Sequence, residues 1–252
     1  MRPINPEDRT SRTAFTLMEL LVVISLIVLL IAMLTPSLKQ AKRNATDTKC
    51  ASNMRSSTIA FVSYAGDNQQ LFPDFSYDPN TGAQYQVAHY WFRAYWRKHM
   101  WMNYGMSREM YYSPNNDRWN RDDFWIWANG NEETAPLIAG YFYFGSTLTS
   151  TSGFVSSLIN PPPGGGAVFP RRFGNTTSSE LLWTDLNRQL SSHIGQWQTP
   201  GDALRWGSNH YYGNSNQIPH GSHRAFTDNH VEWIKGEEMQ LESTYGGTHM
   251  YW

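Results

Sequence analysis

The longest apolar stretch of the chain comprises twenty residues, Phe15 to Leu34, and Glu19 is its only charged residue. Twenty helical residues, each rising about 1.5 Å, cover about 30 Å, which is the thickness of the hydrocarbon core of a bilayer. The stretch is apolar all round, so it lacks the polar face of a surface helix on a globular core. The pattern predicts a membrane-spanning helix over residues 15–35, after a short polar segment, residues 1–14.

Beyond this stretch the pattern stays helical, but apolar residues occupy only one face. No glycine occurs before Gly66, and apolar or small residues recur every three or four positions, at Ala51, Met54, Thr58, Phe61 and Ala65. We expect the helix to continue over residues 36–66 and to lay this stripe on a head domain formed by residues 67–252. The predicted fold class is α+β, with a long N-terminal transmembrane helix packed on an antiparallel β-sheet.

Two short apolar runs in the second half of the chain predict buried strands. Residues 140–145, GYFYFG, alternate little, as in a strand that is covered on both faces. Residues 179–187, SELLWTDLN, have the pattern of a central strand with Asp185 at its end. Residues 161–166, PPPGGG, predict a surface loop, and residues 206–221 predict another.

Residues 223–235, HRAFTDNHVEWIK, have the pattern of a β-hairpin. Asp228-Asn229 stands between two strand-like runs as a two-residue turn, in which asparagine can adopt the positive φ that glycine more often supplies. Val231 and Trp233 would then share one face of the second strand.

Composition and charge exclude several classes of protein. The net charge is −1 and charged residues make up 16% of the chain, which is not the basic footprint of a nucleic-acid-binding protein. The single cysteine, Cys50, excludes an intramolecular disulfide framework and a cysteine zinc cluster. There is no Walker loop, HExxH, Gly-x-Ser-x-Gly or dinucleotide fingerprint, and we expect no enzymatic activity.

Aromatic residues are abundant, with eleven Trp and fourteen Tyr, and they form blocks at residues 89–105 and 117–127. Such side chains either fill a core while their polar tips reach water, or stack on sugar rings at a surface. We take core filling as the first interpretation. A membrane-anchored module that binds polysaccharide through these residues is the alternative function.

Glu19 needs an explanation, because a carboxylate inside an apolar span is costly and by default marks a function. A secretory signal peptide would have a shorter apolar region followed by a small-x-small site, and a plain anchor would not need the glutamate. A third interpretation leaves Glu19 hydrated at the interface. The basic excess before the span, Arg2, Arg9 and Arg12, predicts a cytoplasmic N-terminus with the remaining chain on the other side.

A polar leader with basic residues, then Ala14 and FTLMELLVVISLIVLLIAMLTP, resembles the N-terminus of type IV pilins and type II secretion pseudopilins. The resemblance implies that a prepilin peptidase cuts between Ala14 and Phe15 and that the new amine is N-methylated. It also implies that Glu19 pairs with the amine of a neighbouring subunit during assembly and that Pro36 kinks the helix. The family usually has Gly where this chain has Ala14.

The same resemblance implies a structural subunit of a type II secretion or type IV pilus-like fibre. Its partners would be the peptidase, other pilin or pseudopilin subunits and the bacterial inner membrane. The helix would cross that membrane once, and the head would lie in the periplasm or on the cell surface.

Two further segments, CASNMRSSTIAFVSYAGDNQQLFP and FTDNHVEW, resemble pilin-like proteins of planctomycetes, lentisphaerae and verrucomicrobia that carry an H-X9-DG C-terminal motif. The matching residues are His220, Phe226, Asp228, Asn229, His230 and Trp233. Asn229 replaces the turn glycine, and seven residues instead of nine separate His220 from Asp228. Many relatives have Cys-Pro where this chain has Ser113-Pro114, so the resemblance implies that a disulfide partner of Cys50 is missing here.

Candidate metal ligands gather near the predicted hairpin, where residues 220–230 contain His220, His223, Asp228 and His230. Imidazole and carboxylate groups bind transition metals, but a hairpin places these four at different distances from its turn, and we expect no such site. The pseudopilin resemblance implies Ca²⁺ in a C-terminal loop for some members, and Asp185 or Asp228 with loop carbonyls are the candidates here, although no EF-hand-like run is present. Cys50 has no histidine near it in sequence, so a structural role is expected.

Overall fold

The computed structural model describes residues 15–82, 90–116, 119–127, 130–145, 172, 180–190, 207–210, 218–245 and 248–251. The chain divides into two compact units, an N-terminal unit, Met1–Ala45, and a C-terminal unit, Thr46–Trp252. The fold is α+β, as predicted, with one long helix and antiparallel sheets.

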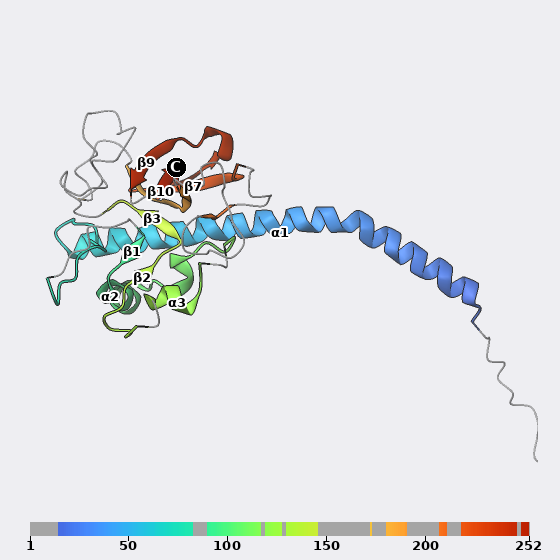
Figure 1. The fold of residues 1–252 in the computed structure, drawn as a ribbon, viewed down its shortest axis with the longest axis horizontal. Coiled ribbons are helices and arrows are strands. Elements are labelled where there is room, and N and C mark those ends of the chain that lie inside the picture. The colour runs from blue at the N-terminus through green and yellow to red at the C-terminus, as the bar shows by residue number, and fades with distance from the viewer. Residues whose placement is uncertain are drawn as a thin grey trace, which may run out of the picture. The chain divides into compact units, whose positions relative to one another are not determined.

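Helix α1 comprises Leu17–Asp67 and passes through Pro36 without interruption (Figure 1). Its start is a capping box, in which Thr16 and Glu19 satisfy each other's backbone N–H groups. The Glu19 N–H donates to Thr16 Oγ1 over 3.2 Å, and the Thr16 N–H donates to Glu19 Oε2 over 2.9 Å. The continuous helix confirms the prediction that the apolar stretch and the amphipathic stretch belong to one element.

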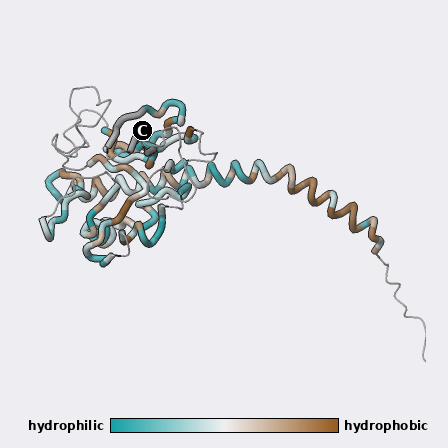
Figure 2. The backbone as a smooth tube through the Cα atoms, in the orientation of Figure 1, coloured by the Kyte–Doolittle hydropathy of each residue, from teal (hydrophilic) through white to brown (hydrophobic). Residues whose placement is uncertain are grey.

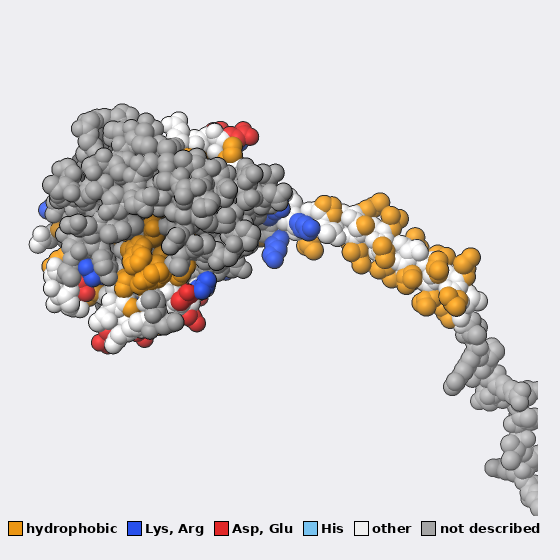
Figure 3. All heavy atoms as spheres, viewed as in Figure 1, with side chains coloured by type: hydrophobic (Ala, Val, Ile, Leu, Met, Phe, Trp, Pro, Cys, Tyr) orange, Lys and Arg blue, Asp and Glu red, His pale blue; other side chains and the backbone are white. Residues whose placement is uncertain are grey.

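The apolar part of α1 buries nothing within the protein. An 18-residue window there has a mean hydropathy of 3.0 and none of it is buried, and Figure 2 shows the change to polar residues further along the helix. Hydrophobic side chains cover this part of the helix in Figure 3. Among the described residues this is the one helix long and apolar enough to cross a membrane.

The C-terminal part of α1 is a core element of the C-terminal unit. Met54, Phe61 and Ala65 from the predicted stripe are fully buried. Phe61 meets aromatic rings of strands β3 (Tyr141–Tyr143) and β4 (Leu181–Asp185), while Tyr64 meets Trp96 of helix α2 (Ala94–Tyr104). The helix therefore has partners on two sides, and in Figure 1 it passes between these strands and helices.

The main sheet is antiparallel and packs on α1. Its strand order is β3-β4-β7-β8, formed by Tyr141–Tyr143, Leu181–Asp185, Gly221–Phe226 and Val231–Lys235. The second antiparallel sheet has the order β6-β5-β10-β9, formed by Gly207–Ser208, Asn187–Leu190, Thr248–Tyr251 and Leu241–Tyr245. A two-stranded antiparallel sheet pairs β1, Trp91–Phe92, with β2, Leu137–Ile138. The remaining elements are α2, η1, α3 and η5, formed by Ala94–Tyr104, Arg108–Tyr111, Asp122–Trp125 and Gly236–Glu238.

Both predicted buried strands are present. β3 lies within residues 140–145 and is buried throughout, and β4 is an inner strand of the main sheet that ends at Asp185. Only Leu186 separates β4 from β5, so the chain passes from one sheet to the other directly after Asp185. The predicted loop at residues 161–166 lies outside the described residues.

The β7–β8 hairpin is confirmed, but its turn is longer than predicted. The Asn229 N–H donates to Phe226 O over 2.9 Å, and the Phe226 N–H donates to His230 O over 3.1 Å. Asn229 has a φ of 69°. The loop therefore has three residues, 227–229, and consists of a turn followed by a residue with left-handed backbone conformation. This is one of the common hairpin connections. The prediction of a two-residue turn is wrong, because the loop is one residue longer.

Candidate functional site

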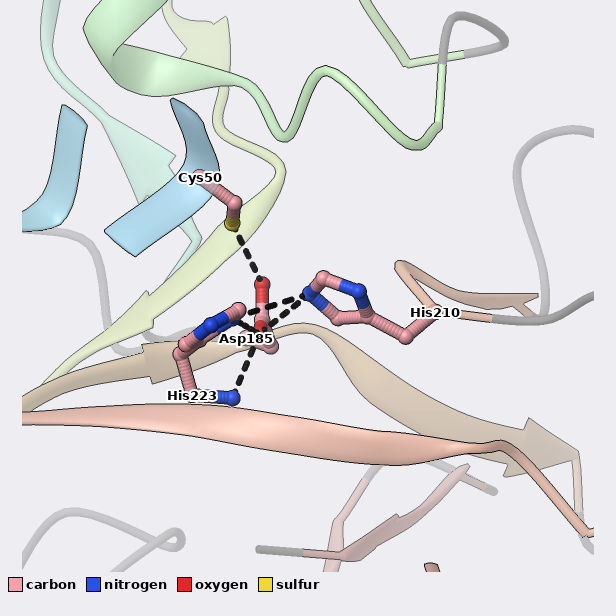
Figure 4. Close-up of side chains that lie close together, drawn as sticks. All are labelled: Cys50, Asp185, His210 and His223. Carbon is pink, nitrogen blue, oxygen red and sulfur yellow. Dashed lines mark hydrogen bonds and ion pairs between the residues drawn. The ribbon is translucent and has the colours of Figure 1, made fainter. Parts of the chain in front are cut away.

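Four buried side chains capable of ligating a metal converge between α1 and the main sheet (Figure 4). Cys50 comes from α1, Asp185 ends β4, His210 follows β6, and His223 lies in β7. Their ligand atoms all lie within 4.8 Å of one another. Four separate segments of the chain thus meet at one point.

Backbone pairing explains how the sheet brings these residues together. β4 and β7 are antiparallel neighbours with Thr184 opposite Arg224, which places Asp185 beside His223. The Asn209 N–H donates to Leu186 O over 3.1 Å and fixes the segment that carries His210. The site therefore forms where the chain leaves the main sheet for the second sheet.

The carboxylate of Asp185 is the centre of the cluster. Its Oδ2 accepts the backbone N–H of His223 over 2.6 Å and lies 2.8 Å from His210 Nε2 and 3.1 Å from His223 Nδ1. Its Oδ1 accepts the Asn209 side-chain amide over 2.8 Å, and the Cys50 thiol donates to it over 3.5 Å. The two imidazole nitrogens lie 3.1 Å from each other.

His210 is held in one orientation by a second carboxylate. Its Nδ1 lies 2.9 Å from Asp47 Oδ1, and that oxygen also accepts the Asn115 amide over 2.7 Å. A carboxylate accepts hydrogen bonds, so Nδ1 must carry the proton in this contact. Nε2 is the atom that faces Asp185 and His223.

Two hydroxyl groups complete the surroundings of the Cys50 sulfur. Ser113 Oγ lies 3.5 Å from Sγ and Tyr141 Oη lies 3.4 Å from it. Burial, together with the neighbouring Cys50 and Asp185, raises the pKa of Tyr141 well above its ordinary value. Its hydroxyl consequently stays protonated at neutral pH and can donate to sulfur.

Burial and charge act against each other on the ionisable groups. Burial alone would raise the pKa of Asp185, but His210 and His223 outweigh it and hold this pKa well below its usual range. Burial alone would lower the histidine pKa values, but Asp185 raises the pKa of His210 strongly and that of His223 to about 9. Each group is thus stabilised in its charged form by the others.

The cluster is closed to solvent. Cys50, Asp185 and His210 are 0% exposed and His223 is 6% exposed. A catalytic cysteine has to reach its substrate, and reactive cysteines are partly exposed. The arrangement therefore suits a bound ion or an internal ion-pair network better than nucleophilic catalysis.

The structure gathers some of the sequence-predicted candidates and separates others. Asp185 and His223 lie in the cluster, whereas the Asp228 carboxylate contacts His230 Nδ1 over 2.5 Å at the exposed turn. His220 is exposed, and its ring lies beside Trp233, 5.9 Å between centroids. Asp228 and His230 thus meet at the turn, while His223 finds its partners in the buried cluster.

Sequence reasoning missed His210, because it lies in residues 206–221, which were predicted to be loop only. The structure instead has β6 at residues 207–208 in that segment, and β7 begins at its last residue, Gly221. The Ser-Asn-His run that follows has no ligand spacing by itself. The pairing of β6 with β5, which sets Asn187 opposite Ser208, and the bond from Asn209 N–H to Leu186 O bring it to Asp185.

Of the predicted processing and assembly residues that the structure describes, Phe15 and Glu19 lie at the start of α1, and Pro36 lies within it. Ala14 lies outside the described residues, Phe15 is 72% exposed, and Glu19 is bound to Thr16. In the hairpin motif, Phe226 stacks on His230 with ring centroids 4.2 Å apart, and Trp233 packs edge-on against His210 and His223. The motif therefore supports the hairpin and borders the buried cluster.

Comparison with known proteins gives no relative: no family model, no curated protein and no solved structure matches this chain. A function therefore has to be inferred from the residues and their geometry.

Proposed function

We propose that this protein is a membrane-anchored structural subunit of a pilin or pseudopilin kind. Its N-terminal helix spans the bacterial inner membrane in the precursor and packs among other subunits in a fibre after cleavage before Phe15. The observation that carries the proposal is that one uninterrupted helix, α1, joins an apolar segment with no buried residue to the core of a folded unit.

This continuity weighs against the two simpler interpretations of an apolar N-terminal helix. A core helix of a soluble protein would be mostly covered, and none of this window is. A secretory signal sequence would end at a cleavage site with small residues, and α1 instead continues to Asp67, with Phe61 buried in the core. An apolar surface of this size requires lipid or neighbouring helices around it.

Glu19 has a partner even in the single chain, since Thr16 supplies two hydrogen bonds to its carboxylate over 2.8 and 2.9 Å. The capping box keeps the carboxylate satisfied at the helix start. In the proposed fibre the cationic N-terminal amine of a neighbour approaches this carboxylate. A charged partner of this kind stabilises the assembly, because a carboxylate within an apolar bundle is otherwise costly.

One contact within the C-terminal unit supports the resemblance behind the proposal. Ser113 stands where many of the pilin-like proteins named above have cysteine, and its Oγ lies 3.5 Å from Cys50 Sγ. The position that the resemblance pairs with Cys50 is thus its neighbour in space, 63 residues away along the chain.

The proposal is tested by separating the assembly role of Glu19 from its capping role. Glu19→Ala removes the assembly carboxylate together with its half of the cap, whereas Thr16→Ala removes only the hydroxyl half of the cap and leaves the carboxylate. With a prepilin peptidase and a pilus-assembly apparatus present, we expect Glu19→Ala to stay in the membrane fraction but to be absent from sheared fibres. Thr16→Ala should enter fibres. Equal incorporation of the wild type and Glu19→Ala would refute the assembly role, and recovery of the uncleaved chain in the soluble fraction would refute the anchor.

A second candidate function, polysaccharide binding, is favoured by one pocket of about 660 Å³ beside α2. Trp101, which is 61% exposed, lines it together with Tyr95, Asn103 and Glu132. An exposed indole beside amide and carboxylate groups suits a sugar ring. Many other aromatic side chains among the described residues belong to the core, including Trp96, Trp119 and Trp183, each at most 3% exposed.

Retention of the full chain on polysaccharide beads would support this second function if Trp101→Ala abolished it. Ile59, on α1 and 54% exposed, does not line this pocket and provides the control Ile59→Ala. Absence of retention by the folded wild-type protein would remove the candidate.

A further inference from the structure

We propose that Cys50, Asp185, His210 and His223 together bind one Zn²⁺ ion in a closed structural site. The four donors are a thiolate, a carboxylate and two imidazoles, all of which are ordinary zinc ligands. Nitrogen and sulfur donors fit Zn²⁺ better than Ca²⁺, which takes oxygen ligands.

The spacing of the donors is close to that of a tetrahedral zinc site. Bonds of about 2.0–2.3 Å place neighbouring ligand atoms about 3.3–3.7 Å apart in a tetrahedron. Asp185 Oδ2 lies 2.8 Å from His210 Nε2 and 3.1 Å from His223 Nδ1, and the two nitrogens are 3.1 Å apart. Cys50 Sγ lies 3.5 Å from Asp185 Oδ1. The three contacts among Oδ2 and the two nitrogens need to lengthen by only a few tenths of an ångström, and all four ligand atoms lie within 4.8 Å of one another.

The side chains and the backbone group that contact the four donors orient them, as outer-shell hydrogen-bond partners do in known metal sites. Asp47 accepts the Nδ1 proton of His210 and thereby presents the Nε2 lone pair to the centre. Asn209 and the backbone N–H of His223 hold the Asp185 carboxylate over 2.8 and 2.6 Å. Ser113 and Tyr141 place hydroxyl groups against the sulfur, where they favour a thiolate.

Two features favour a structural zinc site and argue against a catalytic metal site or an electron-transfer copper site. All four positions are filled by protein donors within a buried cluster, so a water or substrate has no coordination position. The carboxylate lies as close to the imidazoles as they lie to each other, unlike the long axial ligand of blue-copper sites.

The ion would join α1 to both β4 and β7. Cys50 is the one ligand on α1, and the other three come from β4, β7 and the segment after β6. Zinc would thereby fasten the helix that carries the apolar segment to the main sheet, and its removal should loosen that attachment.

The test uses the full chain in detergent, purified without chelator. Elemental analysis should give about one zinc per chain, and chelator should lower the melting temperature reversibly. After Co²⁺ replaces Zn²⁺, a thiolate-to-cobalt charge-transfer band should appear. Cys50→Ser should abolish this band, and the matched control His230→Gln, which changes an exposed histidine of the same hairpin, should keep it.

Asp47→Asn is a second test that does not depend on the folding of a ligand variant, because it leaves all four ligands in place. It should weaken zinc binding about 10–100-fold while the near-ultraviolet circular dichroism remains that of the wild type. The proposal is overturned if the folded wild-type chain binds neither ion. It is equally overturned if the band persists in a folded Cys50→Ser variant or disappears in His230→Gln.

Discussion

Phe61→Ala tests whether the second half of α1 is an integral part of the core. Phe61 is 0% exposed, and its ring packs edge-on against Phe75, Tyr143 and Trp183 at centroid distances of 5.5, 4.9 and 5.3 Å. Truncating a buried phenylalanine costs about 3–5 kcal/mol of unfolding free energy. Each of the three aromatic pairs contributes about 0.5–1.5 kcal/mol beyond burial, so we expect a loss of unfolding free energy near the upper end of this range.

For a unit of this size, that loss lowers the melting temperature by about 6–20 °C. The assay is the thermal transition of the full chain in detergent, followed by the near-ultraviolet circular dichroism of the tryptophans. Ile59→Ala is the matched control, because Ile59 lies two residues away on α1 and is 54% exposed. We expect it to change stability by less than about 0.5 kcal/mol. Equal small effects of both variants would refute the packing of α1 on the main sheet.

Three further predictions concern the buried cluster and its border. Ser113→Cys should form a disulfide with Cys50 on mild oxidation, because the side-chain atoms already lie 3.5 Å apart; intact-mass analysis that finds two free thiols would contradict this. In chelator-treated protein the melting temperature should fall as the pH rises from about 6.5 to about 9. The pKa of His223 is raised from 6.5 to about 9 in the folded state, so the stabilisation from its proton is complete below 6.5 and lost through 9. His223→Gln should flatten that profile, and an unchanged slope would show that another group titrates. Gly221→Ala should lower the melting temperature by about 2–12 °C, because its Cβ would overlap the Trp233 ring; a wild-type melting curve would mean that the hairpin is packed differently.

The helix and most of the main sheet were predictable from local pattern. The long apolar run, the absence of glycine before Gly66 and the three- and four-residue spacing of the stripe define α1 without any tertiary information. Runs such as Tyr141–Tyr143 and Leu181–Asp185 are short and β-prone, and they are the strands β3 and β4. The turn length was less predictable, because Asn229 suits either of two hairpin loops.

The buried cluster was not predictable as a set. Its members stand at positions 50, 185, 210 and 223, and no short spacing links them as it links the ligands of a zinc finger. Their proximity depends on the antiparallel pairing of β4 with β7 and on the passage of the chain between two sheets. The capping role of Glu19 was visible in Thr-x-x-Glu at the helix start, but the roles predicted for the carboxylate were pairing with a neighbouring subunit or hydration at the interface.

The measurement that tests the central claim most directly is the mass of the mature chain after co-expression with a prepilin peptidase. The proposal predicts a protein that begins at Phe15 with a methylated amine and remains in the membrane. A chain that retains residues 1–14 would contradict it, and α1 would then be an anchor without an assembly role. A chain cut after the apolar segment would make that segment a signal sequence.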